Sequence, residues 1–200
     1  MSDSTEVYYV VLRGAGRQAL FRDDEDRLHF TRAVAEAATA CGITVHAYCW
    51  LQSEARLAVQ VAQVPISQFA QFIAEQHATR VKRRISLTDS HFEQQYRGVR
   101  VDGQTELPDL VRHIHLAPLK AGLAEDLADY PWSSHHVYVG LESQPWVTTA
   151  HTLRHFEESG ADPRRGYMEF MKRGARGLDT PPTPSAVQDT DEPGGDLRKK

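Results

Sequence analysis

The 200-residue sequence contains no asparagine, only two cysteines and no long apolar run. Cys41 and Cys49 are too few for a disulfide-stapled scaffold and are not spaced as a metal knuckle, so we expect reduced thiols in the core. No stretch approaches the roughly 18 consecutive apolar residues of a membrane span, so no membrane partner is expected. The first residues lack the basic and apolar regions of a signal peptide, which predicts a cytoplasmic protein.

An excess of positive charge is also absent. The chain has 23 Lys and Arg residues against 27 Asp and Glu residues, which gives a formal net charge of −4. A protein that binds nucleic acid through its whole surface is usually basic, so any such binding must be confined to a local surface. With 40% hydrophobic and 25% charged residues, the composition is that of a globular protein. The length allows one domain, or one domain and an appendage.

Periodic apolar residues predict alternating strands and helices over the first part of the chain. Runs of β-branched and aromatic residues indicate strands, whereas apolar residues at intervals of three and four indicate helices. Asp23 or Asp24 can cap the first helix, and Gly42 can end it. The predicted elements are a strand at 7–13, a helix over about 24–41, a hairpin of strands at 43–50 and 54–61, a helix at 67–85, a strand at 92–101 and a helix beginning near Pro108.

This order of elements is a split βαβ arrangement. It predicts an α+β fold, a ferredoxin-like antiparallel sheet with helices packed on it. Further helical segments at 133–140, 148–158 and 163–173 predict a C-terminal helical extension. From Gly174 onward Gly and Pro dominate and large apolar residues nearly vanish, so no core can offset the entropy of ordering that segment. We therefore divide the chain into a sheet domain at 1–125, a helical extension at 126–173 and a disordered tail at 174–200.

Five short strings, taken in order and with their spacing, resemble one protein family. They lie at 10–14 (VVLRG), 21–26 (FRDDED), 47–51 (AYCWL), 115–123 (HLAPLKAGL) and 129–134 (DYPWSS). The strings are similar to those of the REP-associated tyrosine transposases, small members of the HUH superfamily of single-strand nucleases. The resemblance covers roughly residues 7–173, and its most specific part is the YPWSS string that follows the HLAPLKAGL string.

The resemblance implies a ferredoxin-like sheet that binds and cleaves single strands or hairpins of DNA. In active members, the second strand of the hairpin carries a His-hydrophobic-His pair that holds a divalent cation such as Mg²⁺ against the scissile phosphate. A helix supplies a tyrosine nucleophile. The cation neutralises phosphate charge and polarises the phosphoryl oxygen, and the phenolate forms a covalent 5′-phosphotyrosine.

The chain departs from the family pattern at all three of these positions. Glu54 and Arg56 stand where the family has its two histidines, and His113 stands where it has the tyrosine. A general loss of histidine does not explain the change, because the chain has ten. Arg56 brings a permanent positive charge to the place of the cation, so we expect neither a metal nor another cofactor.

Two interpretations of Glu54 and Arg56 stay open. They form an exposed ion pair on one face of a strand, worth about 0 to 1 kcal/mol, or Arg56 replaces the charge of the cation and grips a phosphate without activating a nucleophile. An imidazole can attack phosphorus in principle, but His113 would need a positioned partner to do so.

The other histidines are weaker candidates for a site. His113 and His115 would point about 200° apart on a helix and cannot share an ion. His151 and His155 are four residues apart, but a third ligand is missing. His77 lies within an apolar stripe, which predicts a hydrogen-bonded core residue.

Residues 80–100 form a locally basic segment. It has six cations and two carboxylates, a local net charge of +4. The cations suit the C-terminal dipole of a helix, or they contact phosphates beside aromatic rings that stack on bases, for which His91 and Phe92 are also candidates. The residues predicted to bind nucleic acid are Arg13, Arg17, Arg56, Arg80, Lys82, Arg83, Arg84, Tyr96, Arg97, Arg100, Lys120 and Trp132.

The sequence therefore predicts a transposase-like protein that binds single-stranded or hairpin DNA, has lost strand cleavage and serves as a regulator or as a reader of hairpins. RNA stays open as a partner, and monomer and homodimer are undecided. One alternative is a metal-dependent nuclease with a rebuilt site that uses Glu54, His113 or Tyr96. Another is a protein-interaction or small-ligand module, which the negative net charge favours.

Overall fold

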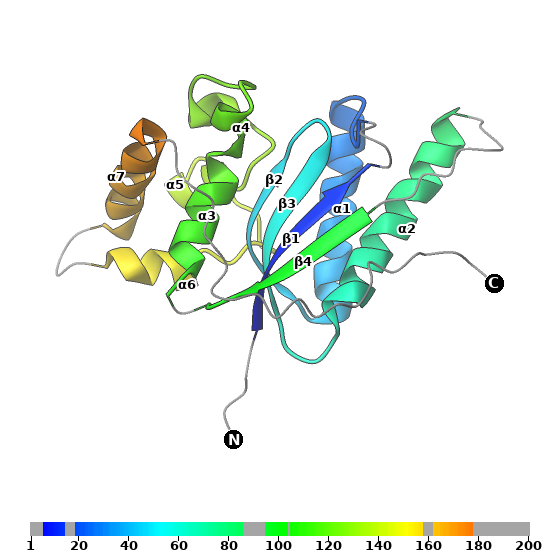
Figure 1. The fold of residues 1–200 in the computed structure, drawn as a ribbon, viewed down its shortest axis with the longest axis horizontal. Helices are drawn as coiled ribbons and strands as arrows, with labels where there is room; N and C mark the ends of the chain where they lie inside the picture. Colours follow the sequence, from blue (N-terminus) through cyan, green and yellow to red (C-terminus); the bar gives the residue numbers. More distant parts are fainter. Residues whose placement is uncertain (1–5, 15–18, 86–94, 104, 158–161, 178–200) are drawn as a thin grey trace.

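A single four-stranded sheet forms the centre of the protein (Figure 1). The computed structural model describes residues 6–14, 19–85, 95–103, 105–157 and 162–177, and of residues 82–85 and 95 it describes only the backbone. All strand pairs are antiparallel, and the order is β2-β3-β1-β4. This order confirms the predicted ferredoxin-like fold. The strands are β1 (Glu6–Arg13), β2 (Thr44–Trp50), β3 (Glu54–Val61) and β4 (Gln95–Val101).

The first helix, α1 (Asp24–Cys41), has the bounds that its capping residues predict. The Asp23 carboxylate accepts a hydrogen bond of 2.9 Å from the backbone N–H of Asp26, which satisfies one of the free donors at the helix start. Gly42 follows the helix with φ of 62°, a left-handed conformation that favours glycine.

One face of the sheet is covered by α1 and α2 (Ile66–Ile85), seen on the right of Figure 1. Because side chains alternate along a strand, Val10 and Leu12 of β1 and Leu57 of β3 point to this face and are fully buried. At its centre the ring of Phe30 packs edge-on against Trp50, with ring centroids 5.0 Å apart.

The other face carries the remaining helices. Ala47, Cys49 and Ala58 of the sheet pack there against apolar residues of the first of these helices and of the C-terminal extension, so sheet and extension share a core. The helices are α3 (Leu107–His115), α4 (Ala117–Lys120), α5 (His135–Val139), α6 (Ala150–Leu153) and α7 (Pro163–Arg176), with 3-10 turns at Leu127–Asp129 and Arg154–Phe156.

The extension also covers the outer edge of β2. The backbone N–H of Trp50 donates to the carbonyl of Trp132 at 2.8 Å, and the N–H of Thr148 donates to the carbonyl of Val45 at 2.8 Å. Ser134 joins the same edge through a bond of 3.0 Å from its N–H to the Tyr48 carbonyl. In the described part of the chain, β4 at the opposite edge pairs only with β1.

Two predictions about the extension need correction. The segment 148–158 is not one helix but α6 followed by a 3-10 turn. The tail does not begin at Gly174, because this glycine is buried within α7, which continues to Arg176; a glycine breaks a helix less readily where tertiary packing supports it. Residues 178–200, and hence most of the predicted tail, lie outside the described residues.

Two further predictions concern cysteine and membranes. Cys41 and Cys49 are buried free thiols, as the sequence predicts. In the described ranges, no helix is both long and apolar enough to cross a membrane.

Candidate functional site

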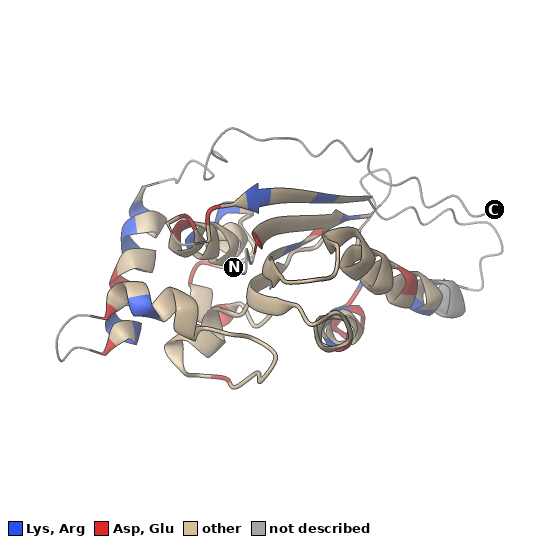
Figure 2. Ribbon diagram, turned by 90° about the horizontal axis from the view of Figure 1, so that it is seen from below, with Lys and Arg blue, Asp and Glu red and all other residues tan. Residues whose placement is uncertain are grey.

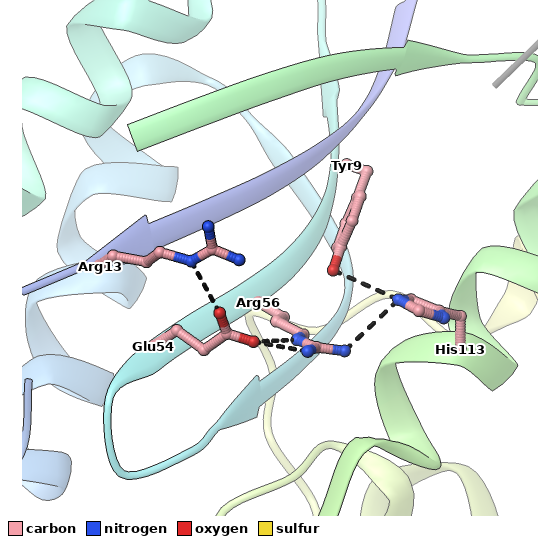
Figure 3. Close-up of polar contacts among 5 residues, drawn as sticks. All are labelled: Tyr9, Arg13, Glu54, Arg56 and His113. Atoms are coloured by element: carbon pink, nitrogen blue, oxygen red, sulfur yellow. Dashed lines mark hydrogen bonds and ion pairs between the residues drawn. The ribbon is translucent and has the colours of Figure 1, made fainter. Parts of the chain in front are cut away.

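The charged residues of the hairpin lie on the face opposite α1 and α2. Glu54 and Arg56 of β3 point to this face, together with Tyr9 and Arg13 of β1 (Figure 3). The antiparallel register places Arg13 directly across from Glu54, and Val11 across from Arg56. The pairing of β1 with β3 therefore creates a cluster that neither strand has alone.

The Glu54 carboxylate lies between two guanidinium groups (Figure 3). Nε of Arg13 donates to Oε2 at 2.9 Å, and Nε of Arg56 donates to Oε1 at 2.6 Å. The Glu54 side chain is only 11% exposed, and that of Arg56 is 21% exposed, whereas that of Arg13 is 63% exposed. Glu54 thus orients both arginines, while the rest of the Arg13 guanidinium stays in solvent.

Two opposing influences act on the Glu54 carboxyl. Burial by itself raises its pKa, but the hydrogen bonds and positive charges of Arg13 and Arg56 together outweigh burial and lower the pKa. Glu54 therefore stays ionised at neutral pH, and the three groups carry a combined charge of +1.

His113 of α3 faces the same cluster from above the sheet. Its Nε2 lies 3.4 Å from a terminal guanidinium nitrogen of Arg56 and 3.4 Å from the phenol oxygen of Tyr9 (Figure 3). A guanidinium only donates hydrogen bonds, so a bond from Arg56 requires an Nε2 without a proton. The three positions at which the chain departs from the family pattern, Glu54, Arg56 and His113, thus meet in one place.

Tyr9 is a member of this cluster that sequence reasoning missed. Its ring lies edge-on to that of His113, with centroids 5.5 Å apart, although the two residues are 104 positions apart in the chain. Burial raises the pKa of the Tyr9 phenol, partly offset by the charge of Arg56, so the phenolate is disfavoured. The alternation along β1 was a usable signal, because it puts Tyr9 and Arg13 on one face.

Arg97 of β4 extends the charge across the sheet. It is exposed and lies across from Val11, which in turn lies across from Arg56, so these residues occupy one row over three adjacent strands. Neighbouring strands are about 4.8 Å apart, which separates the backbones of Arg56 and Arg97 by about 10 Å. Arg13 lies beside this row, two residues along β1 from Val11 on the same face, and the three residues Arg13, Arg56 and Arg97 are together called the arginine row below.

Other predicted contact residues do not join the arginine row. Tyr96 pairs in register with Leu12 and Arg100 pairs with Tyr8, so both point toward the face covered by α1 and α2. Arg100 forms an ion pair of 3.0 Å with Glu6.

Arg80 also lies apart from the row. It is mostly buried and forms an ion pair with Glu25 at 2.5 Å, which ties α2 to α1. A role of Arg80 in DNA binding stays a prediction.

The remaining predicted contact residues are spread over other parts of the chain. Lys120 is exposed on α4. Trp132 is half-buried, and the guanidinium of Arg27 lies 5.6 Å from its ring centroid. Lys82, Arg83 and Arg84 lie in the last part of α2, where only the backbone is described, and Arg17, His91 and Phe92 lie outside the described residues.

Four other histidines, His46, His77, His115 and His135, are buried, whereas His151 and His155 are exposed. His77 is fully buried and donates from Nε2 to the carbonyl of Leu20 at 3.0 Å, which confirms its predicted place. His151 lies with its ring 5.8 Å from that of His46. Burial lowers the pKa of both His46 and His77, so both are neutral at pH 7.

A buried polar network joins α3, α5 and α7. The Tyr167 hydroxyl lies 2.8 Å from Nδ1 of His115 and 2.7 Å from Nδ1 of His135, and Nε2 of His115 lies 2.7 Å from the Ser134 hydroxyl. Burial lowers the pKa of His135 to about 4 and that of His115 well below its usual value. Both imidazoles are therefore neutral and hold the helices together rather than forming part of a reactive site.

The cluster does not fit a divalent cation. Both carboxylate oxygens of Glu54 are occupied by guanidinium donors, and Arg56 holds a positive charge where a cation would need negative or neutral ligands. Within the described ranges, no three His, Cys, Asp or Glu side chains are grouped so that they could hold a metal ion.

Comparison with known proteins shows a likeness of fold. No protein-family model matches the chain, and no curated protein matches it in sequence. A solved structure described as "Structure of the REP associates tyrosine transposase bound to a REP hairpin" matches with a TM-score of 0.57. The match covers 72% of this chain and 86% of that chain, with 15% sequence identity.

Proposed function

We propose that the protein is a transposase-like DNA-binding protein that holds the backbone of a single strand or hairpin on the arginine row. The observation that carries the proposal is the alignment of Arg56 and Arg97 across three strands, with Arg13 beside them. Guanidinium groups bind phosphate oxygens with several N–H donors at once, and they do so without activating a nucleophile.

The fold supports this proposal. The similar solved structure is described as a REP-associated tyrosine transposase bound to a REP hairpin, which makes hairpin DNA the first ligand to test. The motif strings at 115–123 and 129–134 favour membership of the same family, as a member with altered site residues. Because the chain as a whole is negative, binding would depend on this local surface.

Salt dependence of binding tests the proposal. Each phosphate neutralised on a single strand contributes about 0.7 to the slope of log affinity against log salt, so three arginine contacts give a slope of about −2. Fluorescence anisotropy with a labelled hairpin that carries a single-stranded flank, at 50 and 200 mM salt, measures this slope. Absent or salt-insensitive binding would contradict the proposal.

Arg97→Ala and Arg100→Ala form a matched pair of variants. Both residues are exposed on β4, but Arg97 belongs to the arginine row and Arg100 points to the other face. We expect Arg97→Ala to reduce the slope by about 0.7 and Arg100→Ala to leave it unchanged. Equal effects of the two variants would show that the row is not the binding surface.

Loss of metal-dependent cleavage is the second part of the proposal. It is supported by the unsuitable donor set around Glu54 and by the raised pKa of the Tyr9 phenol. The rival proposal is a nuclease with a rebuilt site. In such a nuclease Tyr9 would be a better nucleophile than Tyr96, because the Tyr9 phenol lies beside the His113 imidazole.

Incubation of a labelled hairpin with Mg²⁺ or Mn²⁺ separates the two possibilities. A nicked product, or a covalent protein–DNA adduct, that is lost in Tyr9→Phe would show that the protein is a rebuilt nuclease and would contradict binding without cleavage. We expect an intact hairpin and no adduct.

A further inference from the structure

The last helix carries a concentration of positive charge that the sequence analysis did not single out. Within α7 there are five cations and one carboxylate, a local net charge of +4 in a chain whose net charge is −4. All five cations are exposed. They lie along the left side of the view in Figure 2, away from the sheet. The cations are Arg164, Arg165, Lys172, Arg173 and Arg176.

Three of these cations form a stripe along the helix. At 100° per residue, Arg165, Lys172 and Arg176 fall within a sector of about 40°. The buried residues Tyr167 and Met171 fall roughly 200° to 240° from Arg165, on the opposite side. The stripe therefore faces directly away from the body of the protein. It extends over about 16 Å, since each residue adds about 1.5 Å.

Helix stability alone does not account for this charge. Cations in the last turn, such as Arg173 and Arg176, suit the helix dipole, but cations in the first turn oppose it. Arg164 and Arg165 nevertheless follow Pro163 in the first turn. The guanidinium of Arg164 lies over Gly140, so closely that a Cβ at that residue would clash with it.

Little negative charge compensates the stripe. Arg165 lies 3.6 Å from Glu169 in an exposed ion pair, which is worth about 0 to 1 kcal/mol at most. Among the residues that the structure describes, no carboxylate pairs with Lys172, Arg173 or Arg176. The C-terminal half of the stripe thus presents its charge to solvent.

The helix that bears the stripe is held firmly in place. Tyr167 belongs to the buried network with His115 and His135, and the Arg112 guanidinium of α3 lies 4.0 Å from the ring centroid of Phe170. The cations therefore lie on a helix that is anchored to the rest of the protein by buried contacts. The rings of Tyr167 and Phe170 are buried or covered by Arg112, so α7 offers no platform for stacking bases.

From these observations we infer that the outward face of α7 is a second nucleic-acid surface, which binds the phosphates of duplex DNA without regard to sequence. A duplex presents one charge per 1.7 Å, or roughly ten phosphates over the length of the stripe, while its bases are paired and need no stacking platform. The inference rests on the proposed function for the class of ligand, but it concerns a different surface and a different form of DNA. The sheet would bind the single strand, and α7 would bind a duplex such as a hairpin stem.

The double variant Lys172→Glu/Arg176→Glu of the full chain tests this inference with a blunt duplex that has no single-stranded part. Each lost phosphate contact lowers the log–log salt slope by about 0.9. The ratio of affinities at 50 and 200 mM salt should therefore fall about tenfold, while binding of an unstructured oligothymidine strand stays unchanged. Arg32→Glu on α1, an exposed cation on the other side of the sheet, is the charge control and should leave duplex binding unchanged.

Other outcomes would overturn the inference. Duplex binding by the double variant at the wild-type level would remove α7 as the surface, and equal losses for duplex and single strand would show that the two surfaces are not separate. Binding to phosphatidylserine vesicles without duplex binding would assign the stripe to a lipid surface instead. Failure of the proposed function has a different signature, since Arg97→Ala would then leave binding of the single strand unchanged while the α7 variant still lost the duplex.

Discussion

The two faces of the sheet differ in what their side chains do. Toward α1 and α2 the strands present mainly buried apolar residues such as Leu12 and Leu57. Toward α3 the strands change from apolar residues such as Ala58 and Cys49 to the charged residues Glu54, Arg56 and Arg13. Strand β3 thus contributes both to the apolar core and to the candidate site, because its alternate residues point to opposite faces of the sheet.

Removal of a ring from the apolar face should have the largest effect on stability. Phe30 is fully buried and its ring contacts those of Phe21, Trp50 and His77. We expect Phe30→Ala to reduce the free energy of unfolding by about 3 to 5 kcal/mol, and to leave the DNA affinity of the folded protein unchanged. Urea denaturation and anisotropy measure the two quantities.

Leu28→Ala is the matched control on the same helix. Leu28 is 49% exposed, so its loss should change stability by only about 0.5 kcal/mol or less. A weakened DNA affinity in folded Phe30→Ala would mean that the two faces are not independent.

Acid should destabilise the core behind the charged face. The pKa of His135 is about 4 in the folded protein and about 6.5 in an unfolded chain, so below pH 6.5 the unfolded state binds a proton that the folded state does not. Stability is therefore greatest above about pH 6.5 and falls as the pH approaches 4. The shift corresponds to about 3 kcal/mol from His135 alone.

Unfolding measured between pH 7 and pH 4 checks this expectation. His135→Gln should make the pH dependence shallower, although the other buried histidines keep it from becoming flat. His155→Gln, a change at an exposed residue, is the control. An unchanged slope in the His135 variant would contradict the assignment of this histidine to a neutral buried network.

Neutralisation of Glu54 should affect stability and binding in opposite directions. The Glu54 side chain is 11% exposed, but that of its partner Arg13 is 63% exposed. The loss of stability on Glu54→Gln should therefore lie between the values for exposed and buried ion pairs, at about 1 to 2 kcal/mol. Affinity for single-stranded DNA should rise several-fold, because the variant removes a negative charge beside the phosphate. Denaturation and anisotropy on the same sample test both signs, and a fall in affinity would show that orientation of the arginines outweighs repulsion.

The local elements of the fold could be predicted from the sequence. Asp23 and Gly42 define the ends of α1, and apolar periodicity locates the hairpin and α2, because capping and alternation depend on nearby residues only. The breaks within 148–158 and the true end of α7 at Arg176 could not be predicted in this way. They depend on packing against distant parts of the chain.

The candidate site was only partly predictable. Motif positions identified Glu54, Arg56 and His113, but their contact with Tyr9 depends on the neighbours that each strand acquires in the sheet. Arg97 and Arg100 are close in the sequence and point to opposite faces, a distinction that strand alternation supplies once the strand is placed.

The covered edge of β2 also limits how this protein can meet other chains. Segments of the extension occupy that edge, so among the described residues β4 is the edge strand left for a further strand to join. Arg97 and Arg100 are exposed on β4, one on each face, and charged side chains on an edge strand disfavour pairing with a further strand. Coverage of the β2 edge and exposed cations on β4 are two different ways in which a sheet resists growth by edge pairing.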